Sequence, residues 1–180
     1  MARIVGRAWK FGDDVNTDVI IPARYLYTSD SRVLAAHCLE LADPEFARRV
    51  RPGDVVVAGK NFGCGSSREH AVRAIQACGV AAVVARSFAR IFFRNAVNLG
   101  LLVLESEEAA RLVRSGEVIE IDEEEGLLYL SSGHRLVVRF PAGAAADVQK
   151  AGGLVEYVRQ RLLKRGGCRR PPCIEGEAGP

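Results

Sequence analysis

The chain has 180 residues, of which 48% are hydrophobic and 26% are charged, and its formal net charge is +3. This composition excludes an intrinsically disordered chain and is typical of one globular domain that buries its core without needing disulfides or a structural metal. The basic residues are dispersed except near the C-terminus, so no basic stripe indicates nucleic-acid binding. There is no apolar signal segment and no run long enough to span a bilayer, so we expect a cytoplasmic protein without a membrane role.

The cysteines exclude most metal centres. Their number is odd, their spacings are irregular, and they comprise Cys38, Cys64, Cys78, Cys168 and Cys173. None forms a close pair in the body of the chain, so neither a zinc site nor an iron–sulfur cluster can be assembled there. Cys168 and Cys173 lie in the C-terminal tail and lack partners. We therefore expect no metal in this chain and a reducing compartment.

The N-terminal third alternates strand, turn and helix signals. Residues 3–11 alternate well enough to form a strand, and the short polar residues of 13–18 (DDVNTD) suit a turn that bonds its own backbone. Residues 20–30 start apolar and become polar, which predicts an exposed loop before a helix over 31–39. A short helix over 44–50 follows, with Asp43 as its cap and Pro in its first turn.

The middle of the chain has the pattern of a parallel sheet. Three apolar runs bounded by turn signals, 54–59, 80–85 and 101–104, predict strands covered on both faces. Helices are expected between and after them: one that opens near Ser66 or Ser67 and ends at Gly79, one over 88–98 capped by Ser87, and one that opens at 106–108 and ends near 115–116.

The C-terminal part predicts a different layer. Residues 117–121, 127–130 and 136–140 read as an antiparallel meander, and 144–163 have helical spacing with a break at 152–153. The fold class is therefore α/β, with one domain over 1–165. Residues 166–180 lack periodicity, and we expect a disordered tail.

The stretch 60–70 (KNFGCGSSREH) joins a predicted strand to a predicted helix. Its two glycines permit backbone torsions closed to other residues, and the helix start points unpaired N–H groups into the loop. Ser66 and Ser67 can cap those groups or face a ligand, and Arg68 can hold a carboxylate or a phosphate. The pattern alone therefore predicts either an anion site or a capped helix start with an incidental arginine.

Three known glycine-loop motifs do not match this stretch. A P-loop needs Lys after its last Gly, whereas Lys60 precedes both loop glycines. The dinucleotide fingerprint needs Gly where Arg68 stands, and a nucleophile elbow needs Gly two residues either side of its Ser. A more specific comparison is required.

Residues 63–71 (GCGSSREHA) resemble the signature of the small, swivelling domain of the aconitase superfamily. The closer resemblance is to the separate small subunits of 3-isopropylmalate dehydratase and homoaconitase. Two further stretches agree in order and spacing, 13–22 (DDVNTDVIIP) and 87–96 (SFARIFFRNA), and the match covers roughly residues 3–165. This resemblance implies a swivelling three-layer β/β/α fold.

The resemblance also implies roles for individual residues. Ser66 would be the catalytic base, acting as an alkoxide, while Ser67 and Arg68 would bind a substrate carboxylate and Asp18 would face the active site. Cys64 is expected to be a packing residue that lets the loop turn, and His70 a supporting residue. His37 and His134 are isolated and are expected to be surface or satisfied histidines. Arg90 and Arg94 are weighted toward solvated or structural roles.

The loop that contains Tyr27 and Thr28 would bind the variable group of the substrate. Members of the family that take homoaconitate tend to present Arg in the tetrapeptide that matches residues 25–28, and here Tyr27 offers an aromatic face instead. An aromatic wall suits a branched alkyl group better than a carboxylate. Arg24 is close enough in sequence to weaken this inference, so a homoaconitase-like specificity stays open.

The reaction implied by the family is a dehydration followed by rehydration of a dicarboxylate. It needs a [4Fe–4S] cluster, and no cysteine trio for one exists here, so a large partner subunit would supply it. Two other classes stay open. One is a non-catalytic anion-binding module, and the other is a serine hydrolase that uses Ser66 or Ser67 with His70, which would react with a fluorophosphonate probe.

Overall fold

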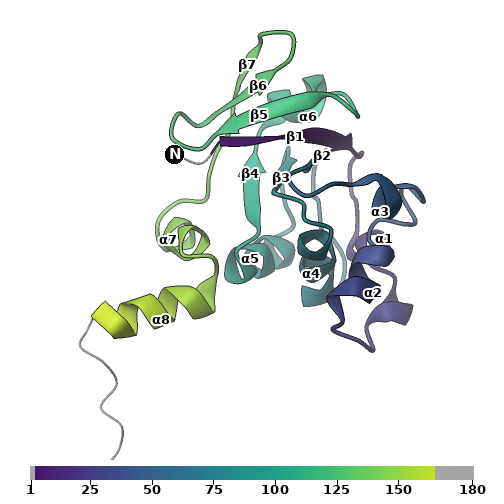
Figure 1. The fold of residues 1–180 in the computed structure, drawn as a ribbon, viewed down its shortest axis with the longest axis vertical. Coiled ribbons are helices and arrows are strands. Elements are labelled where there is room, and N and C mark those ends of the chain that lie inside the picture. The colour runs from purple at the N-terminus through teal and green to yellow at the C-terminus, as the bar shows by residue number, and fades with distance from the viewer. Residues whose placement is uncertain (1–2, 165–180) are drawn as a thin grey trace, which may run out of the picture.

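The computed structural model describes residues 3–164 (Figure 1). A seven-stranded sheet has the order β4-β3-β2-β1-β5-β6-β7. The first four strands are β1 (Arg3–Lys10), β2 (Val55–Ala58), β3 (Ala82–Ala85) and β4 (Leu102–Glu105), and they are parallel. The others are β5 (Val118–Asp122), β6 (Leu127–Leu130) and β7 (Arg135–Val137), and they form an antiparallel meander.

Strand β1 joins the two halves of the sheet. Its first five residues pair antiparallel with β5, from Arg3 opposite Asp122 to Arg7 opposite Val118. Its last three residues pair parallel with β2, from Ala8 opposite Val55 to Lys10 opposite Val57. The strand thus changes partner midway, and the sheet folds over at this point (Figure 1).

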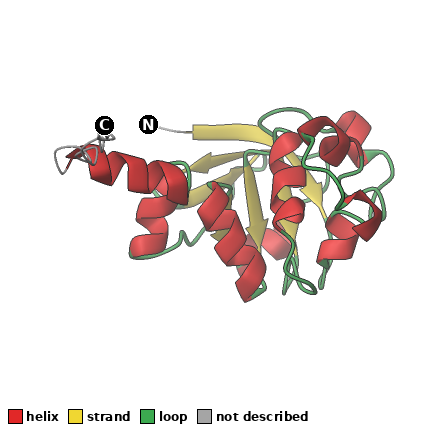
Figure 2. Cartoon of the chain, turned by 90° about the horizontal axis from the view of Figure 1, so that it is seen from below, coloured by secondary structure: helices red, strands yellow, loops and turns green. Residues whose placement is uncertain are grey.

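Short helices precede the second strand and longer ones connect the parallel strands. The helices of the described residues are α1 (Thr17–Ile20), the 3₁₀ helix η1 (Ala23–Tyr25), α2 (Ser31–Ala36), α3 (Phe46–Arg49), α4 (Glu69–Ala77), α5 (Arg90–Leu99), α6 (Glu107–Leu112), α7 (Ala144–Lys150) and α8 (Leu154–Lys164). Seen from below, most of them lie on one side of the strands (Figure 2).

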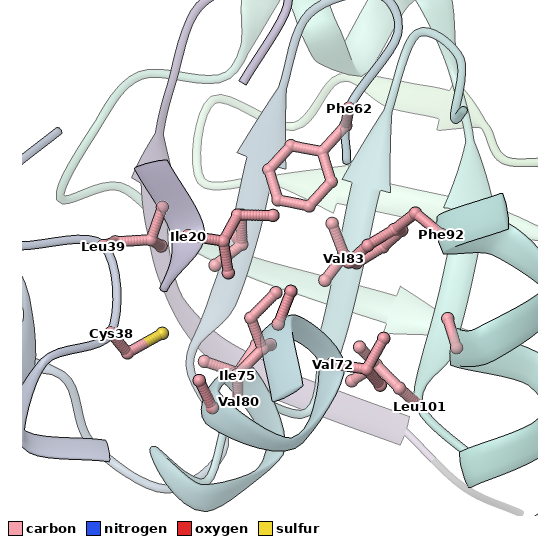
Figure 3. Close-up of a cluster of buried hydrophobic side chains, with 14 of the residues drawn as sticks. Ile20, Cys38, Leu39, Phe62, Val72, Ile75, Val80, Val83, Phe92 and Leu101 are labelled. Carbon is pink, nitrogen blue, oxygen red and sulfur yellow. The ribbon is translucent and has the colours of Figure 1, made fainter. Parts of the chain in front are cut away.

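Two cores explain the layers, because alternate residues of a strand face opposite sides. Val56 and Ala58 of β2 belong to one core cluster. Phe62, Ile75 and Phe92 of the same cluster are labelled in Figure 3. Val55 and Val57 pack instead with α6 and with apolar residues of β5 and β6, such as Ile119 and Leu128. The folded-over sheet therefore makes two β layers beside one helical layer, which confirms the predicted three-layer β/β/α class.

The parallel strands, the meander and the break between α7 and α8 are confirmed, but two helix starts are wrong. Helix α4 begins at Glu69 after an extended Arg68, so Ser66 and Ser67 do not cap it. Helix α5 begins at Arg90 with Ala89 as its N-cap, and the Ser87 hydroxyl accepts from the Asn61 N–H instead. Ser87 bonds the glycine loop, and Ser66 and Ser67 stay in the non-helical stretch before Glu69. Contacts within the loop thus compete with local capping.

The other helix ends differ from expectation by a few residues. Helix α2 ends at Ala36 and α6 at Leu112, each earlier than predicted, while the predicted Ser106 cap of α6 is confirmed by its bond to the Ala109 N–H. Helix α3 begins at Phe46 with Glu45 as its N-cap, so the predicted Asp43 cap is wrong; Asp43 accepts from the Glu45 N–H in the turn before the helix. No helix of residues 3–164 is long and apolar enough to cross a membrane. The predicted disordered tail, with Cys168 and Cys173, lies outside the described residues.

Asp54 is a buried carboxylate that fastens the start of β2 to its surroundings. It is 6% exposed, and its two oxygens accept hydrogen bonds from the Arg7 N–H, the Trp9 indole N–H and the Arg51 N–H, at 3.1, 2.8 and 2.9 Å. It thus links β1, the turn before β2 and the tryptophan ring, and removing it would leave all three donors unpaired.

We expect Asp54→Ala to lower the free energy of unfolding by about 2–4 kcal/mol, because buried donors lose their acceptor. Urea unfolding followed by the emission of Trp9, the single tryptophan of the chain, would measure the loss. Glu124→Ala, at an exposed turn position, is the matched control. Equal midpoints for the two variants would contradict this account of Asp54.

Candidate active site at the glycine loop

The glycine loop of residues 59–68 lies along the N-terminal turn of residues 12–18. The Gly59, Gly63 and Thr17 N–H groups donate across this contact to the Gly12, Val15 and Cys64 carbonyls, at 3.0, 2.8 and 2.8 Å. In the reverse direction the Asp14 N–H donates to the Lys60 carbonyl at 2.9 Å. Two segments that lie far apart in the sequence thus form one short parallel ladder beyond the ends of β1 and β2.

The polar side chains of the turn hold the loop as well. The Thr17 hydroxyl donates to the Ser66 carbonyl at 3.0 Å, and the Asn61 side-chain amide donates to Asp14 at 2.9 Å. Asp13 accepts from the Lys60 N–H at 2.8 Å. These three contacts were not predicted, because a polar turn in a sequence reads as bonding its own backbone and gives no sign of a distant partner.

The third sequence motif closes the other side of the loop. The Phe62 N–H donates to the Ser87 carbonyl at 3.0 Å, and the Ala89 N–H donates back to Phe62 at 2.9 Å. The rings of Phe62 and Phe92 meet edge to face, with centroids 5.2 Å apart. The three motifs that were noticed separately in the sequence therefore converge on one loop.

Gly63 and Gly65 both have left-handed backbone torsions, with φ of +78° and +93°. A Cβ built on Gly63 would lie 2.2 Å from the Phe92 ring, so the loop rests directly on the start of α5. A Cβ on Gly65 would meet the Thr17 hydroxyl at 3.3 Å, with its other neighbours at ordinary contact distances of 3.7 and 3.9 Å. Both positions need glycine for its torsions, and Gly63 also needs it for space.

Arg68 and Asp18 form an ion pair at the end of the loop. The Arg68 Nη1 donates to Asp18 at 2.5 Å and to the Ile21 carbonyl at 3.4 Å. The Arg68 side chain is only 12% exposed, whereas that of Asp18 is 52% exposed. Since both contacts use Nη1, the other guanidinium N–H groups remain for a second anion. The structure thus brings together two residues that were predicted to share a site.

Ser66 and Ser67 lie beside this ion pair on the exposed stretch before α4. The contact that ties Ser66 to the turn is made by its carbonyl, so it does not engage the hydroxyl. No side chain caps the N-terminus of α4, whose first N–H groups carry the positive end of the helix dipole. Two exposed serines, a guanidinium and an uncapped helix start thus follow one another along the end of the loop, a combination of groups that suits an anion.

Tyr27 and Thr28 follow η1 and stay apart from these contacts. Tyr27 is 80% exposed, and the Thr28 hydroxyl accepts from the Asp30 N–H at 3.0 Å, just before α2. Their predicted role toward a substrate stays a prediction. Arg24, the residue that left a homoaconitase-like specificity open, forms an ion pair with Glu40. Arg90 and Arg94 are exposed.

The described residues do not fit a metal centre. Within 3–164, no group of three or more His, Cys, Asp or Glu side chains could hold a metal ion. Cys38 and Cys78 are buried in the helical core. Burial, followed by the nearby negative charge of Asp14, raises the pKa of Cys64, so its thiol stays protonated at neutral pH.

An open cavity of about 520 Å³ lies by the meander, lined by Arg114, His134 and their neighbours, away from the loop.

The fold and the loop define a class of protein. Residues 20–109 match the model of the aconitase C-terminal domain. A solved structure, the crystal structure of a 3-isopropylmalate dehydratase from Methanocaldococcus jannaschii, superposes with a TM-score of 0.87 and 46% sequence identity. The match covers 91% of this chain and 98% of that one. The class is therefore that of the aconitase C-terminal domains.

Curated relatives narrow the class. The small subunits of 3-isopropylmalate dehydratase from Heliobacterium modesticaldum and Moorella thermoacetica are 50% and 53% identical over 160 and 161 residues, which is 88% of this chain and 96% of each relative. The one from Aquifex aeolicus is 52% identical over 163 residues, with 89% and 96% covered. The chain belongs to the family of 3-isopropylmalate dehydratase small subunits.

We expect Gly63→Ala to lower the free energy of unfolding by about 3 kcal/mol, because a methyl group must displace the Phe92 ring and the backbone torsion is strained. Gly65→Ala should lower the free energy of unfolding by less, since the nearest neighbour of the added carbon is the end of the Thr17 side chain. Urea denaturation would rank both against Gly12→Ala, where nothing lies within 4 Å of the added carbon. A Gly63→Ala protein as stable as the Gly12→Ala control would contradict the packing argument.

Proposed function

We propose that the chain is the small subunit of a 3-isopropylmalate dehydratase, which interconverts 2-isopropylmalate and 3-isopropylmalate by dehydration and rehydration in leucine biosynthesis. The observation that carries the proposal is the set formed by the exposed Ser66 and Ser67 and the ion pair of the nearly buried Arg68 with the half-exposed Asp18. It has one guanidinium for a carboxylate contact and a hydroxyl for proton transfer. The names of the relatives supply the substrate.

In this proposal Ser66 is the base. Its alkoxide takes the proton from the carbon next to a substrate carboxylate and becomes the neutral hydroxyl, and the reverse transfer completes rehydration. A serine hydroxyl is a very weak acid, so the alkoxide must be stabilised by positive charge nearby. Arg68 and the unpaired N–H groups at the start of α4 lie in the adjoining stretch and can supply it. Because neither serine caps α4, the hydroxyls stay available.

Arg68 and Ser67 would hold a substrate carboxylate. Nη1 is bound to Asp18, and the remaining N–H groups of the guanidinium can bind a second carboxylate side by side. Asp18 thereby sets the orientation of the guanidinium and offsets its charge while the site is empty. This explains why an arginine that is 12% exposed is tolerated at the loop.

The removal of the hydroxyl group is assigned to a large subunit. The residues 3–164 offer no ligand set for a metal, and we place the [4Fe–4S] cluster of the reaction on that partner. The exposed serines fit a half-site that a partner covers when it docks. The complex would be a heterodimer or a heterotetramer acting in the cytoplasm.

The choice of substrate is inferred from η1 and the segment after it. Arg24, within η1, is the cation that would bind an additional carboxylate, and it is already bound to Glu40. Tyr27 offers an exposed aromatic face to a branched alkyl group. A small subunit of homoaconitase or of another hydro-lyase of 2-substituted malates is the runner-up, and a substrate panel with the reconstituted pair would separate them.

Ser66→Ala should reduce turnover of 3-isopropylmalate by at least about a hundredfold, because the proton acceptor is lost. Its affinity for the large subunit, measured by titration calorimetry, should match that of the unaltered chain. Ser29→Ala, at another exposed serine, is the control. If Ser66→Ala keeps full turnover, the hydroxyl is not the base. If the unaltered chain shows no turnover and Ser66→Ala only weakens the binding of an inorganic anion, the protein is a non-catalytic anion-binding module.

Reconstitution tests whether activity and bound iron require the large subunit. The purified chain alone should show neither hydro-lyase activity nor bound iron, and activity should appear on addition of the large subunit of a 3-isopropylmalate dehydratase. Iron analysis of each subunit, and absorbance of the carbon–carbon double bond that dehydration of the substrate forms, would follow both properties. Full activity of the isolated chain, or iron bound to it in a defined ratio, would overturn the half-enzyme proposal.

A further inference from the structure

A network of four side chains surrounds η1, just before the segment with Tyr27 and Thr28. The Tyr25 ring stacks on the His37 imidazole, with centroids 3.9 Å apart and planes 11° from parallel. The Arg24 guanidinium lies 4.9 Å from the centre of the same ring. Glu40 binds both neighbours of the ring: its Oε1 accepts from Arg24 and its Oε2 from His37 Nδ1, at 2.7 Å in the latter pair. The network is called the Tyr25 clamp below.

Glu40 is the residue that holds the clamp closed. Its side chain is 20% exposed, compared with 62% for that of Arg24. Burial acts to raise the pKa of Glu40, but the hydrogen bonds and charges of His37 and Arg24 outweigh burial and hold that pKa below its usual value. The carboxylate is therefore charged at neutral pH and binds both partners.

The backbone around Glu40 is built for this contact. The preceding residue, Leu39, is fully buried and has a φ of +55°, which is rare for a leucine and costs free energy. Its N–H donates to the Ile20 carbonyl at 2.8 Å. The strained turn therefore directs the chain after α2 back over η1 and places Glu40 beside Arg24.

Helix η1 is held by side-chain contacts more than by its own backbone. None of its three residues is fully buried and no side chain caps it, while Tyr25 packs against the helical core from a partly buried position. Its two internal hydrogen bonds run from the Tyr25 and Leu26 N–H groups to the Pro22 and Ala23 carbonyls, at 3.0 and 3.1 Å. A single turn of this kind is marginal in water, so its position depends on the side chains around it.

We propose that Glu40 is a positioning residue for substrate choice: by binding Arg24 and His37 around Tyr25, it fixes the segment of Tyr27 and Thr28 and keeps the Arg24 charge compensated. The inference rests on the proposed function, in which this segment meets the variable group of the substrate. A compensated Arg24 attracts no additional carboxylate, and a fixed Tyr27 presents its ring to an alkyl group. The clamp thus determines preference for a branched alkyl substrate.

The test uses the complex with the large subunit and the variant Glu40→Gln. Its KM for 3-isopropylmalate should rise about fivefold, the factor expected for loss of a partly buried ion pair, with kcat changed less than about twofold. The kcat/KM preference for 3-isopropylmalate over homoaconitate should fall by about tenfold, because Arg24 is released. In Arg24→Ala/Glu40→Gln the preference should return while the KM stays raised. Glu45→Gln, which removes the exposed pair of Glu45 with Arg48, is the matched control and should leave both values unchanged.

A second measurement needs no turnover. Hydrogen exchange at the Tyr25 and Leu26 amides should be at least about fivefold faster in Glu40→Gln than in Glu45→Gln. If Glu40→Gln does not fold, His37→Gln opens the other side of the clamp and takes its place in both experiments.

The outcomes separate the two proposals. Unaltered complex that does not turn over 3-isopropylmalate counts against the proposed function. Unchanged exchange together with an unchanged substrate preference in Glu40→Gln overturns the clamp. A fall in thermal stability alone, with the preference kept, reduces Glu40 to a structural residue and also overturns it.

Discussion

The backbone ladder between the N-terminal turn and the glycine loop determines where every residue of the site lies. Its hydrogen bonds continue the pairing of β1 with β2, in which Lys10 lies opposite Val57 and the Gly59 N–H then donates to Gly12. A shift of that register by one residue would turn each side chain to the opposite face. It would also move Asp18 away from Arg68, which lies 50 positions further along the chain. The site is therefore a consequence of strand register before it is a consequence of side-chain chemistry.

The elements of the fold could be predicted because their signals are local. Continuous apolar runs identified β2, β3 and β4, and glycines at 79, 100 and 152–153 marked ends of helices. The starts of α4 and α5 could not be predicted, because capping competes with longer-range contacts. Ser87 bonds the glycine loop through both its hydroxyl and its carbonyl, so it is not free to cap α5. Whether such a serine caps a helix or bonds a distant loop is decided by the tertiary structure.

A candidate site could be proposed from the sequence, but its geometry could not. The loop pattern alone was compatible with a plain helix start, and the resemblance of three motifs singled out Ser66, Arg68 and Asp18. The structure adds the partners: Asp18 is tied to Arg68, and Arg24 is tied to Glu40. The second pair depends on the buried Leu39 and its left-handed torsion, which no pattern of residue types reveals. The roles of Ser66, Ser67, Tyr27 and Thr28 stay predictions.

The divided pairing of β1 has a consequence for the nascent protein. Strand β1 leaves the ribosome well before β5, yet its first half needs β5 as a partner, and Arg3 reaches Glu120 across 117 positions. At translation speeds of about 5–20 residues per second, this edge waits on the order of ten seconds for its partner. During that time an unpaired strand is open to pairing with a neighbouring chain. Its three basic residues, Arg3, Arg7 and Lys10, repel the same strand of a neighbouring chain, so the strand that joins the two halves of the sheet also resists association with other chains until β5 has been made.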